Sequence, residues 1–135
     1  MSKFVSTTYT NSKEILKFDH YVAMGVTVDD AGIVANADGK KIVPAGTIIG
    51  GTGGANAILA KDTVLATKHN TQSGATGSAG AGVDAEGILL TDVDVTYGDA
   101  PGTMVIHGFI DLSKLPEAPC ADAIAALKSR IIFLV

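Results

Sequence analysis

The sequence has 135 residues, of which 47% are hydrophobic and 5% aromatic, with no Trp. This length is typical of one domain with its own core, and the hydrophobic content excludes a disordered chain. Ten Lys and Arg residues against fourteen Asp and Glu residues give a formal net charge of −4. Such a surface disfavours nucleic acid and anionic lipid, so we expect neither as a partner.

Cysteine usage and the amino terminus indicate where the chain folds. Cys120 is the only cysteine, which fits a reducing compartment such as a cytoplasm. The first ten residues, MSKFVSTTYT, lack the apolar segment of a signal peptide. No apolar run approaches the roughly 20 residues of a membrane span. We expect a soluble protein with no membrane partner.

Residues 1–20 are polar, rich in Ser and Thr, and without sustained periodicity, which predicts a flexible, extended arm. A single domain is expected from residue 21 to residue 135. Val22, Met24, Val26 and Val28 recur with a period of two, which predicts a half-buried strand over 21–28. Asp38-Gly39 then predicts a hairpin that joins strands at 32–35 and 41–43.

The middle of the chain is richest in glycine. A turn at 44–46 is expected to lead into a short strand at 47–49 and a glycine loop at 50–54. Two further short strands are predicted at 57–60 and 63–66. The segment 69–82, HNTQSGATGSAGAG, has almost no apolar side chain larger than Ala, which predicts a mobile surface loop.

The last third has the strongest pattern. A strand is expected over 88–95, a turn over 97–102, and a returning strand over 104–112. Residues 121–128 are helix formers, and the wholly apolar ending 131–135 must pack in its own sheet or on a partner. The predicted fold class is therefore mainly β, a small β-sandwich or barrel with one short carboxy-terminal helix.

Few residues point to chemistry. Asp92 and Asp94 share a strand face, and His107 on the partner strand is a candidate third ligand or acid–base group. Alternating Asp on a solvated face is the more common reading of this pattern. His20 and His69 have no His or Cys at the spacing of metal ligands. No residue that would activate Cys120 as a nucleophile can be identified in the sequence. We expect no catalytic residue, no metal and no cofactor.

One stretch is familiar. Residues 86–116, EGILLTDVDVTYGDAPGTMVIHGFIDLSKLP, resemble the head decoration and head fibre proteins of tailed phages, the family that includes the phage lambda decoration protein. The segment Ile42-Val43-Pro44-Ala45-Gly46-Thr47 resembles a turn common in these proteins. The resemblance covers roughly residues 21–135 and is weakest across the glycine-rich middle.

The resemblance implies a compact, tulip-like β domain that forms a homotrimer on the outer surface of the virion head. It implies binding to the major capsid protein of the expanded shell, stabilisation against the pressure of packed DNA, and no active site. The arm would add a strand to a capsid sheet through Phe4, Val5, Thr7, Thr8 and Tyr9. The apolar ending is the expected trimer interface, formed by Ile131, Ile132, Phe133, Leu134 and Val135.

Three other functions fit the sequence less well. A phage-surface adhesion module would bind a glycan through the 69–82 loop or the acidic hairpin, but the chain has few aromatic side chains for a sugar platform. A small metal-dependent hydrolase would need Asp92, Asp94 and His107 to meet around an ion. A cellular β domain with an unrelated binding role leaves the patterned last third unexplained.

Overall fold

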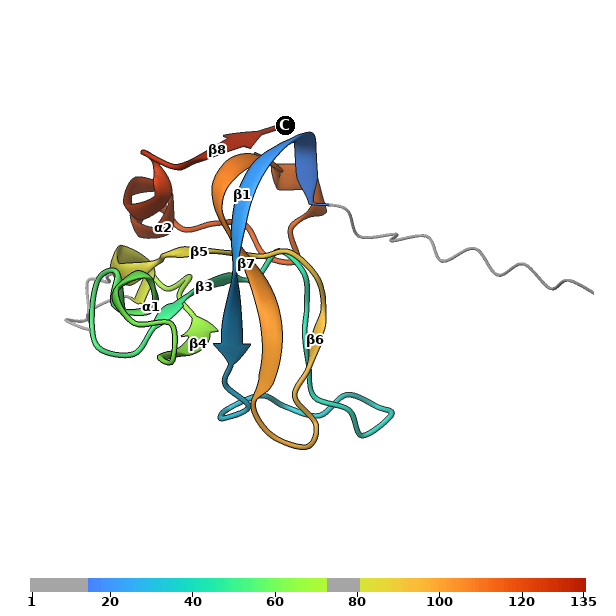
Figure 1. The fold of residues 1–135 in the computed structure, drawn as a ribbon. Helices are drawn as coiled ribbons and strands as arrows, with labels where there is room; N and C mark the ends of the chain where they lie inside the picture. Colours follow the sequence, from blue (N-terminus) through green and yellow to red (C-terminus); the bar gives the residue numbers. More distant parts are fainter. Residues whose placement is uncertain (1–14, 73–80) are drawn as a thin grey trace, which may run out of the picture.

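A computed structural model describes residues 15–72 and 81–135, and the fold is mainly β. The strands are β1 (Leu16–Val28), β2 (Ile42–Val43), β3 (Ile48–Gly51), β4 (Leu65–Lys68), β5 (Gly87–Leu89), β6 (Val93–Asp94), β7 (Ala100–Asp111) and β8 (Ile131–Leu134). Two α-helices, α1 (Ala57–Ala60) and α2 (Ala121–Leu127), and two 3₁₀ turns, η1 (Ala81–Asp84) and η2 (Leu112–Lys114), connect them (Figure 1).

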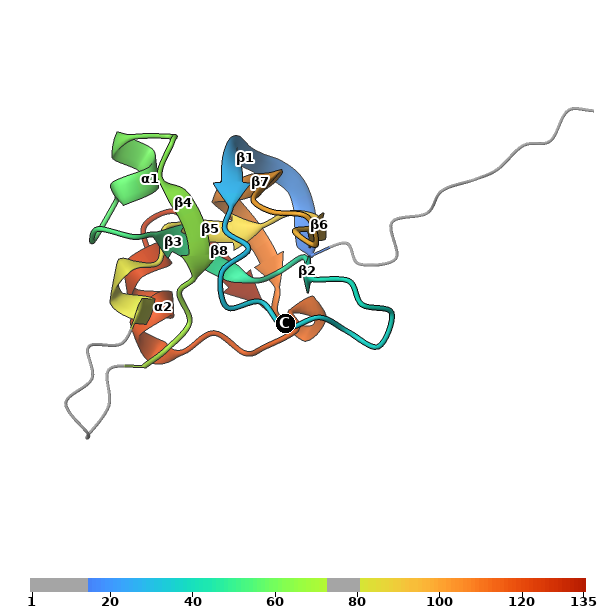
Figure 2. The same cartoon turned by 90° about the horizontal axis from the view of Figure 1, so that it is seen from below.

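The main sheet closes on itself. Its strand order is β1-β4-β3-β5-β7-β8, and β1 also pairs with β7. Five of the six strands therefore form a ring, which is visible when the molecule is seen from below (Figure 2). The β1–β4 and β7–β8 pairs are parallel, whereas the other neighbours in this sheet are antiparallel. A separate two-stranded ladder joins β2 to β6.

The strands at the centre of the sheet are buried on both faces. Neighbouring residues of β7, Met104 and Val105, are both fully buried but belong to different apolar clusters. The cluster around Met104 lines the interior of the ring, because all five ring strands contribute to it. The cluster around Val105 lies outside the ring, beneath Ala123 and Leu127 of α2. Alternation along each strand thus fills two cores at once.

A buried carboxylate fixes the short helix α1. Glu86 is fully buried, and its side-chain oxygens accept hydrogen bonds from the backbone N–H groups of Gly51, Ile58 and Leu59 at 2.7, 3.1 and 2.9 Å. The residue before the helix, Asn56, has a left-handed backbone and makes no side-chain cap. Glu86 therefore satisfies amide groups that the start of a helix leaves without partners.

Several predictions are confirmed. The chain is mainly β, the helix expected over 121–128 is α2, and the apolar ending is strand β8 of the domain's own sheet. The strands expected at 21–28 and 104–112 exist as β1 and β7, and each begins earlier than predicted. The predicted antiparallel pairing of the 88–95 and 104–112 segments is also present, between β5 and β7.

The arm prediction needs correction at its boundary. Residues 16–20, predicted as part of the arm, belong to β1, and the preceding Ile15 is completely buried. Phe18 and His20 gain ring contacts with β7, which explains why a polar-looking segment joins the sheet. The residues predicted to contact a capsid, Phe4 to Tyr9, lie outside the described residues.

Three local predictions are wrong. The Asp38-Gly39 hairpin is absent, because the Asn36 side chain closes a small loop by accepting from Asp38 N and Lys40 N, and Ile42–Val43 pairs with β6 instead. Residues 57–60 form α1 rather than a strand, since Glu86 caps them. The strand predicted over 88–95 is divided into β5 and β6.

The predicted loop 69–82 is shorter than expected at both ends. His69 and Asn70 are buried, and η1 begins at Ala81. Asn70 fixes the segment before α2, because its side chain donates to Ala118 O at 3.0 Å and accepts from Cys120 N at 2.7 Å. The glycine-rich centre of the loop, 73–80, lies outside the described residues.

Candidate functional site: an apolar outer face

An apolar surface runs across the amino-terminal half of β1, the carboxy-terminal half of β7, and β8. We call it the outer face, and it is formed by Phe18, His20, Val22, His107, Phe109 and Ile132. Register places these side chains on one side of the sheet, since Val22 pairs with His107 and Phe109 pairs with Ile132. Phe18 and His20 lie where the register of β1 to β7 is irregular, and their ring contacts with Phe109 and His107 place them beside the same surface.

Ring contacts hold the outer face together. The Phe18 and Phe109 rings meet edge to face with centroids 5.4 Å apart, and the His20 and His107 rings do the same at 5.5 Å. His20 also lies 6.3 Å from the Phe109 ring. Such edge-to-face pairs stabilise aromatic clusters beyond their buried area. The cluster therefore gives the two strands a defined arrangement at this end.

The outer face is open to solvent although it is largely apolar. Phe18 is 53% exposed, Val22 51% and Ile132 46%. His107 is held in place by its Nδ1, which donates to the backbone oxygen of Arg130 at 2.7 Å. A carbonyl oxygen only accepts, so Nδ1 carries the proton and Nε2 is left as the acceptor of the neutral ring. Large exposed apolar side chains that are contiguous on a rigid sheet indicate an interaction surface.

The predicted trimer residues divide between two sides of β8. Ile131 is only 2% exposed and Phe133 packs against the same apolar cluster, so both face the domain's own core. Ile131 is therefore unavailable as a partner contact. Ile132 and Leu134 point to the other side, beside Phe109 and Asp111 of β7. Val135, at the end of the chain, is 92% exposed.

The structure does not bring Asp92, Asp94 and His107 together. Asp92 accepts from Ala45 N at 2.7 Å, and Asp94 accepts from the backbone N–H and the hydroxyl of Thr96. These bonds lower the pKa of Asp94 below its usual value, the hydroxyl bond having the larger effect. His107 lies further along β7, opposite Val22. Each of the three has a local structural role.

The other singled-out residues also have structural partners. His69 is buried against Gly50, and its Nδ1 contacts Thr67 O at 2.9 Å. Cys120 is the residue before α2, where its Sγ accepts from Ala123 N at 3.4 Å. Both residues therefore belong to the packing of their own segments.

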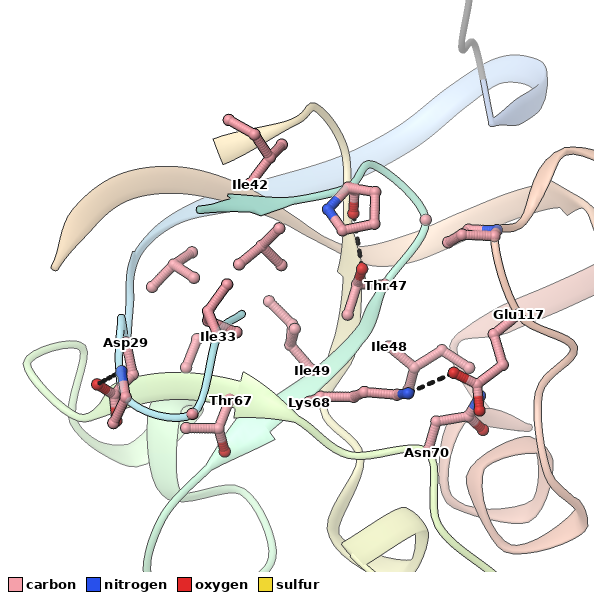
Figure 3. Close-up of a pocket in the computed structure, with 18 residues that line it drawn as sticks. Asp29, Ile33, Ile42, Thr47, Ile48, Ile49, Thr67, Lys68, Asn70 and Glu117 are labelled. Atoms are coloured by element: carbon pink, nitrogen blue, oxygen red, sulfur yellow. Dashed lines mark hydrogen bonds and ion pairs between the residues drawn. The ribbon is translucent and has the colours of Figure 1, made fainter. Parts of the chain in front are cut away.

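A pocket of about 430 Å³ lies between the loop after β1, the β2–β3 turn and β4. Figure 3 shows Ile33, Ile42 and Ile49 around it, with the Lys68–Glu117 ion pair at one end. None of the described residues that line it is aromatic, so it lacks the flat platform that sugars prefer.

Three carboxylates, Asp29, Asp30 and Asp99, lie close together near the pocket, with ligand atoms within 4.8 Å of one another. Two of the carboxylates already accept hydrogen bonds from backbone amides, Asp29 from Ala31 N and Asp99 from Asp30 N. These hydrogen bonds stabilise the turn after β1, so the clustered carboxylates have a structural role there.

The sequence does not identify the outer face, because the polar composition around Phe18 and His20 predicts an arm. A usable signal was present. Phe18, His20 and Val22 alternate, and so do His107 and Phe109, which places two aromatic-rich strips on strands of similar length. What sequence does not supply is the register that joins them.

Comparisons with known proteins leave the family open. No protein-family model matches the sequence, and no curated protein matches it significantly. Within residues 15–72 and 81–135, the helices are too short or too polar to cross a bilayer.

Proposed function

We propose that the protein is a non-catalytic structural protein that decorates the outside of a phage head as a homotrimer and stabilises the expanded shell. One observation carries the proposal. The outer face is a solvent-exposed, largely apolar surface on the two longest strands of the domain, β1 and β7. Contiguous exposed apolar side chains of this kind mark interaction sites, including protein–protein interfaces.

The trimer follows from the resemblance described above, and the outer face gives it a candidate contact. In a threefold ring, one surface of each copy meets a different surface of the next. Ile132, Leu134 and Val135 extend the outer face to the end of the chain, where a neighbouring copy can cover them. Phe18 and Phe109 provide the aromatic anchors that dominate interface energetics.

The capsid contact is assigned to the amino-terminal segment. Phe4, Val5, Thr7, Thr8 and Tyr9 have side chains that favour strands, and such a segment can add to an exposed sheet edge of the major capsid protein. Three segments on one trimer bind together at high effective concentration. Weak individual contacts then give a trimer that stays on the shell while DNA is packed.

Light scattering of the purified protein is the first test. A trimer has three times the 13.7 kDa mass of the chain, or about 41 kDa. A protein that remains at 13.7 kDa at all concentrations, and does not bind shells, contradicts the proposal.

The second test is shell binding after deletion of the amino-terminal segment. The structure determines which residues are removed. Ile15 is fully buried and β1 begins at Leu16, so residues 2–14 are removed and the rest is kept. The shortened protein should remain a folded trimer and lose binding to expanded shells prepared without the decoration protein. A matched control replaces Ser2 by Ala and retains binding.

A glycan-binding adhesion module is the second candidate, and it draws on the same surface. Phe18 is exposed and lies beside Phe109. The two rings are inclined at 76°, however, so they do not form one flat platform for a sugar. Replacement of Phe18 by Ala separates the candidates, because it weakens assembly if the face binds protein and weakens glycan binding if it binds sugar.

A further inference from the structure

The main sheet has two free edges beside the outer face. β8 is the last strand in the sheet order, and β1 pairs with β4 only at Thr27 and Val28. In the part of the chain that the structure describes, β7 is the only strand that pairs with β8 or with residues 17–24 of β1. Neither stretch makes a backbone hydrogen bond to a loop or a turn there. At this end the sheet is therefore a three-stranded segment, β1-β7-β8, with a free edge on each side.

The register shows which backbone groups face these edges. Gly108 N donates to Arg130 O at 3.1 Å, so the backbone groups of Gly108 point toward β8. Its register partner in β1, Tyr21, therefore directs its own N–H and C=O away from β7. Groups of successive residues alternate between the two edges of a strand, so those of Ile131 and Phe133 point away from β7 as well. Both edges thus offer a donor and an acceptor to a further strand.

The two edges are also compatible in direction. β1 is antiparallel to β7 and β8 is parallel to β7, so β1 and β8 run in opposite directions. In copies related by rotation about an axis along the strands, β8 of one copy is antiparallel to β1 of the next. Residues 131–135 contain no charged side chain and no Pro, which are common devices that keep an edge from pairing. The β8 edge is therefore suited to pair with a strand of another chain.

The outer face lies on the concave side of this three-stranded segment. Val22, Val26 and Val28 are an even number of residues apart on β1, so their side chains share one face. Val26 and Val28 belong to the apolar cluster inside the ring, around which the sheet curves. The opposite face is already covered, because Ile110 and Ile131 are buried beneath α2. Only the concave side is left for a partner.

We propose that the β8 edge of each copy pairs with the β1 edge of the next, so that three copies close one barrel. This inference rests on the proposed homotrimer and specifies its interface. Three strands from each of three copies make a nine-stranded barrel with the outer face of every copy inside it. Head-to-tail contacts of this kind form a ring when the rotation between copies closes. A barrel of about eight strands has an interior that side chains just fill. Phe18, Phe109 and Ile132 of each copy fill this one.

Cysteine crosslinking tests the pairing between copies. Cys120 is replaced by Ser, Ile132→Cys supplies a thiol on β8, and a second cysteine replaces Phe18, His20 or Val22 in turn. Within one copy, β7 separates the two strands by about 10 Å, which a disulfide does not span. We expect at least one of the three pairs to give a covalent trimer on a gel without reductant. Absence of crosslinks in all three pairs overturns the barrel.

Two controls sharpen the crosslinking result. Ile132→Cys without a second cysteine should not crosslink, and dimers from this variant would show that two β8 edges pair with each other, which overturns the proposal. Lys17→Cys and Asp19→Cys place the second thiol on the opposite face of β1, since these residues alternate with those of the outer face. They should crosslink to Ile132→Cys at less than about a tenth of the yield of the best pair. Equal yields from both faces also overturn it.

Proline variants test the edges without a crosslink. Phe133→Pro and Tyr21→Pro each remove an amide that faces a free edge and keep the amides that face β7. Phe133→Ala and Tyr21→Ala remove the same side chains but keep the amides, so they are the matched controls. By light scattering, each Pro variant should have the monomer mass of 13.7 kDa at concentrations where its Ala control is a trimer. Urea unfolding checks that the variants are folded, and the crosslinks decide for any variant that is not.

The outcomes separate this inference from the proposed function. If the unsubstituted protein is a monomer, the proposed trimer fails and the barrel fails with it. If the unsubstituted protein is a trimer and folded Pro variants remain trimers, only the barrel is overturned.

Discussion

The two halves of the β1–β7 ribbon use the same strands for opposite purposes. Near the turn that joins β6 to β7, Val26 and Val28 are 4% and 2% exposed, whereas Phe18 and Val22 in the other half are 53% and 51% exposed. Both halves are paired across the same two strands, although the register of the exposed half is irregular between Leu16 and Tyr21. Pairing between β1 and β7 alone therefore does not explain the difference in exposure.

The difference in exposure between the two halves comes from closure of the ring. β4 pairs with β1 only at Thr27 and Val28, so the ring surrounds one half of the ribbon and leaves the other half open on one face. β8 extends the sheet beside the open half without covering its outer face. The closed half is buried in the core of the domain, whereas the open half leaves apolar side chains exposed to solvent.

The largest effect is expected from a substitution in the closed half of the ribbon. Met104 is fully buried inside the ring, so Met104→Ala removes buried methylene groups and leaves a cavity. We expect the free energy of unfolding to fall by about 2–5 kcal/mol. Urea unfolding at a fixed protein concentration measures the loss. Phe109→Ala in the open half is the control, and an equal loss there would contradict the division of the ribbon.

Two glycines on the ribbon give a smaller and more local comparison. A Cβ on Gly102 would lie 2.8 Å from Val93 Cγ2 and 3.3 Å from Leu89 Cδ1, whereas a Cβ on Gly25 would have no atom within 4 Å. We expect Gly102→Ala to lower the free energy of unfolding by about 1–3 kcal/mol through overpacking. Gly25→Ala should change it by less than about 0.5 kcal/mol. Thermal unfolding of both variants decides whether the ring interior is as tightly packed as the contacts indicate.

The sequence predicts the parts of this fold that depend on local patterns. Alternation identifies β1 beyond Tyr21 and most of β7, and helix formers identify α2, because these signals need no knowledge of distant residues. The helix α1 was not predictable in this way. It depends on Glu86, a residue 28 positions after Ile58 whose carboxylate satisfies the amide groups at the helix start.

The candidate site was predictable only in part. The apolar ending pointed to an interface, but which of its side chains face the core follows from the parallel register of β8 on β7. Phe18 and His20 lie in a segment of polar composition that does not predict a strand. Their place on the outer face follows from ring contacts with β7. Register and ring closure are long-range properties, so a single sequence does not specify them.

A charge on the open half should abolish assembly while leaving folding intact. Val22→Lys places an ammonium group on the outer face, where covering it would require desolvation of the charge. We expect loss of the proposed trimer by light scattering and a change of less than about 0.5 kcal/mol in the free energy of unfolding of the monomer. Val34→Lys is the control, since Val34 is 86% exposed in the loop after β1 and is outside the outer face. Equal assembly of the two variants would remove the outer face as the interface.

The smallest expected effect concerns two exposed carboxylates, one in each part of the molecule. The Ser113 hydroxyl and then the Ser113 amide lower the pKa of Asp111, and Thr96 has the same effect on Asp94. A lowered folded-state pKa adds stability that is present above the usual value of 3.8 and is lost as the pH falls through the folded-state value. Asp111→Asn should therefore lower the urea midpoint slightly at pH 7, and its difference from the unsubstituted protein should shrink at a pH below both pKa values. Asp94→Asn should behave alike, because both carboxylates are solvated and their hydrogen bonds are local. A much larger pH dependence for Asp111 than for Asp94 would mean that charge contributes more to stability at the end of β7 than in β6.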